Sequence, residues 1–236
     1  MFLDADDFVE GGLLPGLDAA IRQRQTDIAV GPWLYHGDGR KRGQLRCPQE
    51  QATADWMLNW VNGLFFPPCC VAWKADSVRA IGGWDERLKK DQDGELMVRA
   101  FTRGLTVAVS DAGNGVYWQH ASEGRLTRSA QIEHITASAD IVYGQIVEWL
   151  AQGDRPDHLA VALGRHCCKM AWVAYSFDRA DLARQWQKRA AQHGYFNKGY
   201  SHRTSLLAGL LGVRLSARIK TRTRGDSLYL KAIAQR

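Results

Sequence analysis

The chain has 236 residues, of which 45% are hydrophobic, 24% charged and 10% aromatic, a composition that is typical of a globular protein and excludes a disordered or fibrous chain. The net charge of +6 lies at the C-terminal end, where eight Lys and Arg side chains face one acidic side chain from residue 201 onward. The first 200 residues have 23 basic and 24 acidic side chains, which disfavours a nucleic-acid groove across the main body.

Short apolar runs, separated by groups of Gly, Pro and Asp, occupy the chain up to about residue 128. We expect strands at 1–3, 28–35, 69–73, 105–109 and 115–118, and helices at 13–24, 53–61, 74–81 and 94–102. Strands that alternate with helices indicate an α/β layer structure.

Beyond residue 128, apolar residues recur at three- and four-residue steps, which predicts helices. We expect one helix around 132–149, a second around 159–174, and a third with Asp178 as its N-cap and Gly194 at its end. The segment 201–236 would be apolar on one side and basic on the other. It is predicted either to dock on an anionic membrane surface or to pack on the domain with its basic face in solvent.

Five cysteines form two adjacent pairs, Cys69–Cys70 and Cys167–Cys168, plus Cys47. Adjacent side chains point in different directions, and no zinc-type Cys-x-x-Cys spacing occurs. We therefore expect free thiols in a reducing, cytoplasmic compartment.

The segment FLDADD combines an apolar run with Asp4 and Asp6. Carboxylates spaced so closely repel one another unless a cation lies between them, and Mn²⁺ or Mg²⁺ suits such oxygen ligands and also holds phosphates. The alternative is an acidic turn before the next helix.

Two further segments contain candidate reactive side chains. In IGGWDERLKKDQDGELMVRA, Asp93 could act as a general base or could cap a helix. After the last expected strand come His120, a possible nitrogen ligand for a metal, and a loop that contains Arg125 and Arg128.

Together, in this order, the three segments resemble the family 2 glycosyltransferases of the GT-A fold. FLDADD resembles the metal-binding Asp-x-Asp strand of that family, IGGWDERL its Gly-Gly-aromatic-Asp-Glu segment, and QDGELMVRAFTRG the segment around its catalytic base. The resemblance covers residues 1–128 and implies a partial GT-A mixed sheet with flanking helices, followed by an all-α region. The expected division is 1–128 (catalytic), 129–200 (helical hairpin) and 201–236 (basic amphipathic segment).

The resemblance implies inverting transfer of a sugar from a nucleotide-diphosphate sugar to the hydroxyl of a glycan or lipid-linked acceptor. Asp93 would be the base, Asp4 and Asp6 would hold the divalent cation and the donor diphosphate, and His120 would add a metal ligand. Arg125 and Arg128 would contact the diphosphate. We expect a cytoplasmic enzyme, peripheral to the inner membrane face if the basic segment docks there.

In that family an N-terminal half binds the nucleotide before the Asp-x-Asp motif, which here begins at residue 4. The resemblance therefore predicts a truncated catalytic domain, which could be active as it stands or could need the donor-binding half to be supplied. The main alternative is a non-catalytic remnant that binds a partner or a membrane surface. A haloacid-dehalogenase-like phosphatase also begins with Asp-x-Asp, but that family has Thr or Val where this chain has Phe8.

Overall fold

The structure is a computed structural model that describes residues 1–37, 42–119, 131–153, 157–195, 208 and 212–217. The chain divides into two compact units, each described by itself. Unit 1 comprises residues 1–57 and 65–129, and unit 2 comprises residues 58–64 and 130–236. The bounds 1–128, 129–200 and 201–236 that the sequence suggests for domains stay a prediction.

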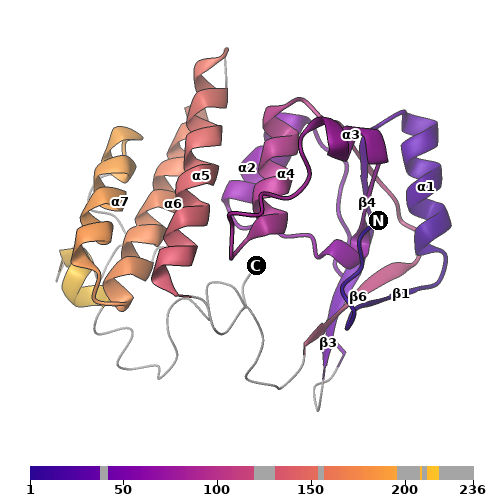
Figure 1. The fold of residues 1–236 in the computed structure, drawn as a ribbon, viewed down its shortest axis with the longest axis horizontal. Coiled ribbons are helices and arrows are strands. Elements are labelled where there is room, and N and C mark those ends of the chain that lie inside the picture. Colours follow the sequence, from indigo (N-terminus) through magenta and orange to yellow (C-terminus); the bar gives the residue numbers. More distant parts are fainter. Residues whose placement is uncertain (38–41, 120–130, 154–156, 196–207, 209–211, 218–236) are drawn as a thin grey trace. The chain divides into compact units, whose positions relative to one another are not determined.

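Unit 1 is a mixed α/β structure (Figure 1). Its elements are β1 (Phe8–Glu10), α1 (Leu13–Arg24), β2 (Ile28–Val30), β3 (Trp33–Gly37), the first half of α2 (Thr53–Val61), the 3₁₀ turn η1 (Pro68–Cys70), β4 (Val71–Trp73), α3 (Ala75–Ala80), α4 (Gln92–Thr102), β5 (Val107–Val109) and β6 (Asn114–Gln119). In Figure 1, α1 and α4 lie on opposite sides of the strands.

The strands form two small mixed sheets. In the order β1-β6-β3, β6 pairs antiparallel with β1 and parallel with β3, and Tyr35 lies opposite Tyr117. In the order β4-β2-β5, β2 pairs antiparallel with β4 and parallel with β5, and Ala29 lies opposite Ala108. A parallel pair needs a crossover connection, which the intervening helices provide.

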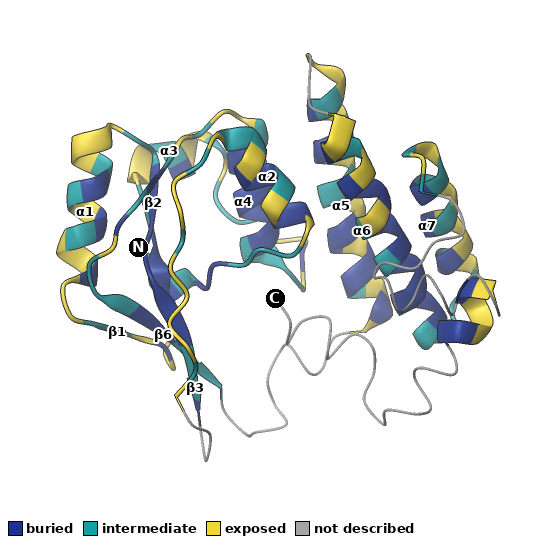
Figure 2. Cartoon of the chain, turned by 180° about the vertical axis from the view of Figure 1, so that it is seen from behind, coloured by how far each residue is buried: buried dark blue, intermediate teal, exposed yellow. Residues whose placement is uncertain are grey.

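The core of unit 1 follows from helix periodicity. The inward residues of α1 are Leu13, Leu17 and Ala20, and they pack on the small residues Ala29 of β2 and Ala108 of β5. Helix α4 buries a wider apolar face that consists of Leu96, Met97, Val98, Ala100 and Phe101. Figure 2 shows α1 with buried and exposed residues along its length, whereas α4 is buried or partly buried throughout. The α/β prediction is confirmed.

Two strand predictions need correction. The run 28–35 forms two strands in different sheets, because Pro32 between them has no N–H to donate to a ladder. Residues 1–3 form no strand. Instead the N–H of Asp7 donates to the carbonyl of Asp4 at 3.1 Å, which closes a turn, and the first strand begins at Phe8.

Unit 2 is helical, with α5 (Ile132–Ala151), α6 (Asp157–Ser176) and α7 (Ala180–Gln192). The stripe predicted for α5 is largely buried, with Ile135, Ile146 and Trp149 inside. Helices α6 and α7 pack on each other as a hairpin, and the hydroxyl of Tyr175 donates to Gln187 at 2.8 Å between them. The helical C-terminal part matches the prediction.

Asp178 is not the N-cap of α7. It has a left-handed backbone (φ 57°) in the turn that ends α6, where the N–H of Arg179 donates to the carbonyl of Ala174. Asp tolerates this conformation better than most side chains. Helix α7 then begins at Ala180, with Arg179 as its cap.

All five cysteines are free thiols, as predicted, and four of them are buried. Within the described ranges, the helices are too short or too polar to cross a membrane. Of the basic segment 201–236, the structure describes Ala208 and the helical stretch 212–217. The predicted membrane contact of that segment therefore falls largely outside the described residues.

Candidate functional site

The N-terminal turn of unit 1 holds three carboxylates in four residues, Asp4, Asp6 and Asp7. Asp4 and Asp6 are exposed, whereas Asp7 is buried. Partial desolvation of its carboxyl, and then the charge of Asp6, raise the pKa of Asp4 above its usual range. The two residues of the predicted Asp-x-Asp pair therefore repel each other.

Asp7 is the most perturbed acid of this turn. Its Oδ1 accepts the backbone N–H of Trp118 on β6 at 2.8 Å, and its buried Oδ2 has no hydrogen bond of normal geometry from a described residue. Burial raises the pKa of Asp7 to about 7; the Trp118 N–H opposes this shift, and the charges of Asp4 and Asp6 add to it. The thiol of Cys69, whose own pKa burial raises, faces Asp7 from η1.

Asp93 lies in the first turn of α4 and is half-buried. Its Oδ1 accepts a hydrogen bond from the indole Nε1 of Trp84 at 2.9 Å. Burial raises the pKa of Asp93, the Trp84 hydrogen bond lowers it, and the charges of Asp4 and then Asp91 raise it again. The interaction with Asp4 means that the structure brings the N-terminal turn and the start of α4 together within unit 1.

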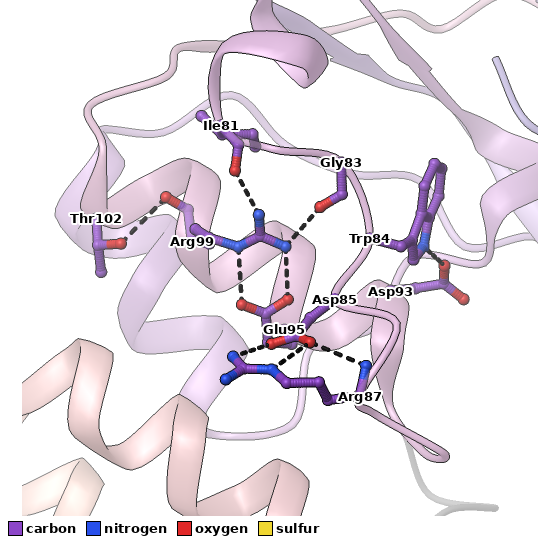
Figure 3. A network of polar contacts seen from close by, with 9 residues as sticks. All are labelled: Ile81, Gly83, Trp84, Asp85, Arg87, Asp93, Glu95, Arg99 and Thr102. Carbon is purple, nitrogen blue, oxygen red and sulfur yellow. Dashed lines mark hydrogen bonds and ion pairs between the residues drawn. The ribbon is translucent and has the colours of Figure 1, made fainter.

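The turn between α3 and α4 is attached to α4 by hydrogen bonds from the guanidinium of Arg99 (Figure 3). Arg99 pairs with Glu95, which is 1% exposed, at 2.8 Å. The same guanidinium donates to the carbonyl of Ile81 and, at 2.6 Å, to that of Gly83. Gly82 and Gly83 have φ of +90° and +65°, a left-handed backbone that accounts for the Gly-Gly pair in the motif.

Asp91 occupies the N-cap position of α4, with a left-handed backbone (φ 57°) and no side-chain capping bond. A Cβ placed on Gly94 would lie 2.5 Å from Oδ1 of Asp91. The glycine in the sequence QDGEL therefore makes room for the Asp91 carboxylate. The capping alternative considered for Asp93 is not what the structure has, because Asp93 is inside the helix and is bonded to Trp84.

A divalent cation fits the exposed carboxylates of Asp4 and Asp6 chemically. Magnesium in particular is often held by one or two carboxylates together with substrate phosphates. Within the part of the chain that the structure describes, no three His, Cys, Asp or Glu side chains form a ready metal cluster. His120, Arg125 and Arg128 lie outside the described residues, so their predicted roles stay predictions.

Two residues of the site were missed by sequence reasoning. Asp7 is not part of the alternating pair, although a third acid within four residues, so close to an apolar run, is itself a signal of a special environment. Trp84 stands out in the sequence only as part of the Gly-Gly-aromatic-Asp-Glu motif. Its hydrogen bond to Asp93 depends on the conformation of the Gly-Gly turn, which the sequence does not show.

The arrangement of sheets and helices is a GT-A-like glycosyltransferase fold. The chain is similar to residues 1–349 of TarS from S. aureus, solved in complex with UDP-GlcNAc, with a TM-score of 0.57 and 15% identity over 96% of this chain and 68% of that one. For the same TarS segment in complex with UDP, the TM-score is 0.53 and the sequence identity 14%, over 96% of this chain and 67% of that one. No family model and no curated protein matches the chain. The likeness at this identity is one of fold.

Proposed function

We propose that this chain is a glycosyltransferase that transfers a sugar, with inversion, from a nucleotide-diphosphate sugar to an acceptor hydroxyl. The observation that carries the proposal is the half-buried carboxylate of Asp93, which lies within electrostatic reach of the Asp4 turn in a GT-A-like fold. A base and a diphosphate-binding carboxylate pair must lie near each other for such a transfer.

Asp93 is the proposed general base. Its carboxylate takes the proton of the acceptor hydroxyl while that oxygen attacks the anomeric carbon, and the bond from that carbon to the diphosphate oxygen breaks with its electron pair on the leaving nucleotide diphosphate. Attack opposite the leaving group inverts the anomeric centre. The raised pKa of Asp93 supports this role, because a base works best when its pKa is near the working pH.

Asp4 and Asp6 are the proposed ligands of Mn²⁺ or Mg²⁺. The bound cation would neutralise charge on the diphosphate leaving group. The two side chains repel each other without a cation, which supports the assignment. Because the similar TarS structures contain UDP-GlcNAc and UDP, a uridine-diphosphate sugar is the first donor to test.

The test is the turnover of Asp93→Asn, measured as release of nucleotide diphosphate from a panel of nucleotide-sugars with Mn²⁺. The amide oxygen of Asn still accepts the Trp84 N–H, so the fold should persist while the base is lost. We expect a decrease of about 10² to 10⁴ in rate.

The matched control is Asp91→Asn, the same change of charge two residues away, at a position where Asn tolerates the left-handed backbone. It should retain most of the turnover. Equal turnover in wild type and Asp93→Asn would refute the role of Asp93. No turnover of any nucleotide-sugar by the wild type would refute the proposed reaction.

A further inference from the structure

The indole of Trp84 contacts both segments of the candidate site. Its Nε1–H donates to Oδ1 of Asp93 at 2.9 Å. Its ring meets the Phe2 ring edge-on, with centroids 4.2 Å apart and planes at 87°. Phe2 is two residues before Asp4, so one side chain touches the proposed base and the segment that carries the proposed diphosphate ligands. Edge-to-face aromatic pairs of this kind are favourable contacts with a defined geometry.

Trp84 is itself held by the helix that carries Asp93. Arg99, on the same helix, donates to the carbonyl of Gly83 at 2.6 Å. The carboxylate of Glu95 accepts from the same guanidinium at 2.8 Å. The contacts form a closed ring from Asp93 along α4 to Arg99, across to Gly83, on to Trp84 and back to Asp93 (Figure 3). This ring, closed by two hydrogen bonds and two stretches of chain, leaves the indole little freedom to turn away.

The hydrogen bond also distinguishes the two oxygens of Asp93. Oδ1 is engaged by an indole N–H, which can donate but cannot accept a proton. Oδ2 has no hydrogen bond to any described residue. The proton of an acceptor hydroxyl can therefore be taken by Oδ2 while Oδ1 stays fixed by Trp84.

We propose that Trp84 is a positioning residue for the Asp93 base: its N–H fixes which carboxylate oxygen is presented to the acceptor, and its ring fixes that oxygen relative to the Asp4 turn. This inference rests on the proposed function. Most of the catalytic benefit of a base is lost when it is misplaced by about 1 Å, which can cost about 10²-fold in rate.

The charged groups that act on Asp93 come from two directions. Asp4 reaches it from the N-terminal turn and Asp91 from the residues before α4, and both raise its pKa together with burial. Trp84 is the neighbour that stabilises the charged carboxylate. Removing the N–H should therefore raise the pKa of Asp93 and move the acidic limb of the pH–rate profile to higher pH.

The variant that tests this contact is Trp84→Phe, which keeps an aromatic side chain but removes the N–H donor together with one of the two rings of the indole. The matched control is Trp73→Phe, on β4, where the half-buried indole makes no hydrogen bond to a described residue. We expect Trp84→Phe to lower kcat about tenfold, the usual weight of a hydrogen bond to a charged group, with the acidic limb shifted upward. Trp73→Phe should leave kcat and the pH profile as in the wild type.

A second readout does not depend on turnover. In ¹H–¹⁵N spectra of the wild type, the Trp84 indole resonance should move as Asp93 titrates, and this movement should be absent in Asp93→Asn. A pH-independent indole resonance in the wild type would overturn the inference, and so would a turning-over wild type in which Trp84→Phe behaves like Trp73→Phe. A wild type without turnover would instead overturn the proposed function, and the catalytic role of Trp84 with it, even if the indole resonance titrates.

Discussion

Asp7 shows how one buried carboxylate can make stability depend on pH. Its Oδ1 accepts the backbone N–H of Trp118, but burial and the charges of Asp4 and Asp6 outweigh this hydrogen bond, so its ionised form is poorly compensated. With a pKa of about 7 in the folded state, against about 3.9 in an unfolded chain, Asp7 keeps its proton on folding between those pH values. The folded state therefore loses stability as the pH rises from about 4 to about 7.

Replacing this side chain by its neutral analogue should remove that pH dependence. In EDTA, Asp7→Asn should be more stable than the wild type at pH 8 by about 1 to 2 kcal/mol and show little advantage at pH 4. Urea unfolding at pH 4, 6 and 8 measures this difference. Asp18→Asn, on the exposed face of α1, is the control and should track the wild type. A difference between Asp7→Asn and wild type that is constant over this pH range would contradict the assignment.

At the scale of elements, Glu95 pairs with Arg99 within α4, and the guanidinium of Arg99 holds the Gly-Gly-Trp turn through its hydrogen bonds to the carbonyls of Ile81 and Gly83. Glu95 is 1% exposed and the Arg99 side chain 16%, so removing one partner leaves a charge buried without its counter-charge. Such a loss costs far more unfolding free energy than the loss of a surface pair, because water solvates the charge that remains at the surface.

Glu95→Gln should therefore destabilise the fold by about 3 kcal/mol, measured as the free energy of unfolding in urea. It should also loosen the turn that carries Trp84, which a change in the Trp84 indole resonance would report. Asp76→Asn, which breaks the exposed Asp76–Arg79 pair on α3, is the matched control and should have no measurable effect. A similar loss of unfolding free energy in both variants would show that the Glu95–Arg99 pair stabilises the fold no more than an exposed ion pair does.

Sequence reasoning predicted helices better than strands in this chain. The helices 13–24 and 53–61 were found with the bounds of α1 and α2, since their apolar spacing is long and regular. Most strands are three residues long, which is too short to show a reliable alternation of apolar and polar residues. Residues 1–3 are apolar enough for a strand but form none, because strand formation also needs a neighbouring strand to pair with, which the sequence does not show. The motif predicts Asp93 as a base, which stays a prediction, whereas its hydrogen bond to Trp84 depends on tertiary structure.

For the whole molecule, unit 1 holds every described residue of the candidate site. The turn of Asp4, the start of α4 and the Gly-Gly-Trp turn all come from this unit, and unit 2 is helical. The likeness to TarS extends over 96% of the chain, so it includes the helical part as well as the α/β part. We propose that unit 1 binds a nucleotide diphosphate with a divalent cation.

The most direct measurement is calorimetric titration of UDP into the full chain, with Mn²⁺ and with EDTA. The account predicts binding that requires Mn²⁺, is lost in Asp4→Asn and Asp6→Asn, and is unchanged in Asp18→Asn. The two tested variants remove cation ligands, whereas Asp18 lies on the exposed face of α1. Absence of UDP binding at millimolar concentration with Mn²⁺, or binding that is equal in EDTA and in both tested variants, would contradict the account.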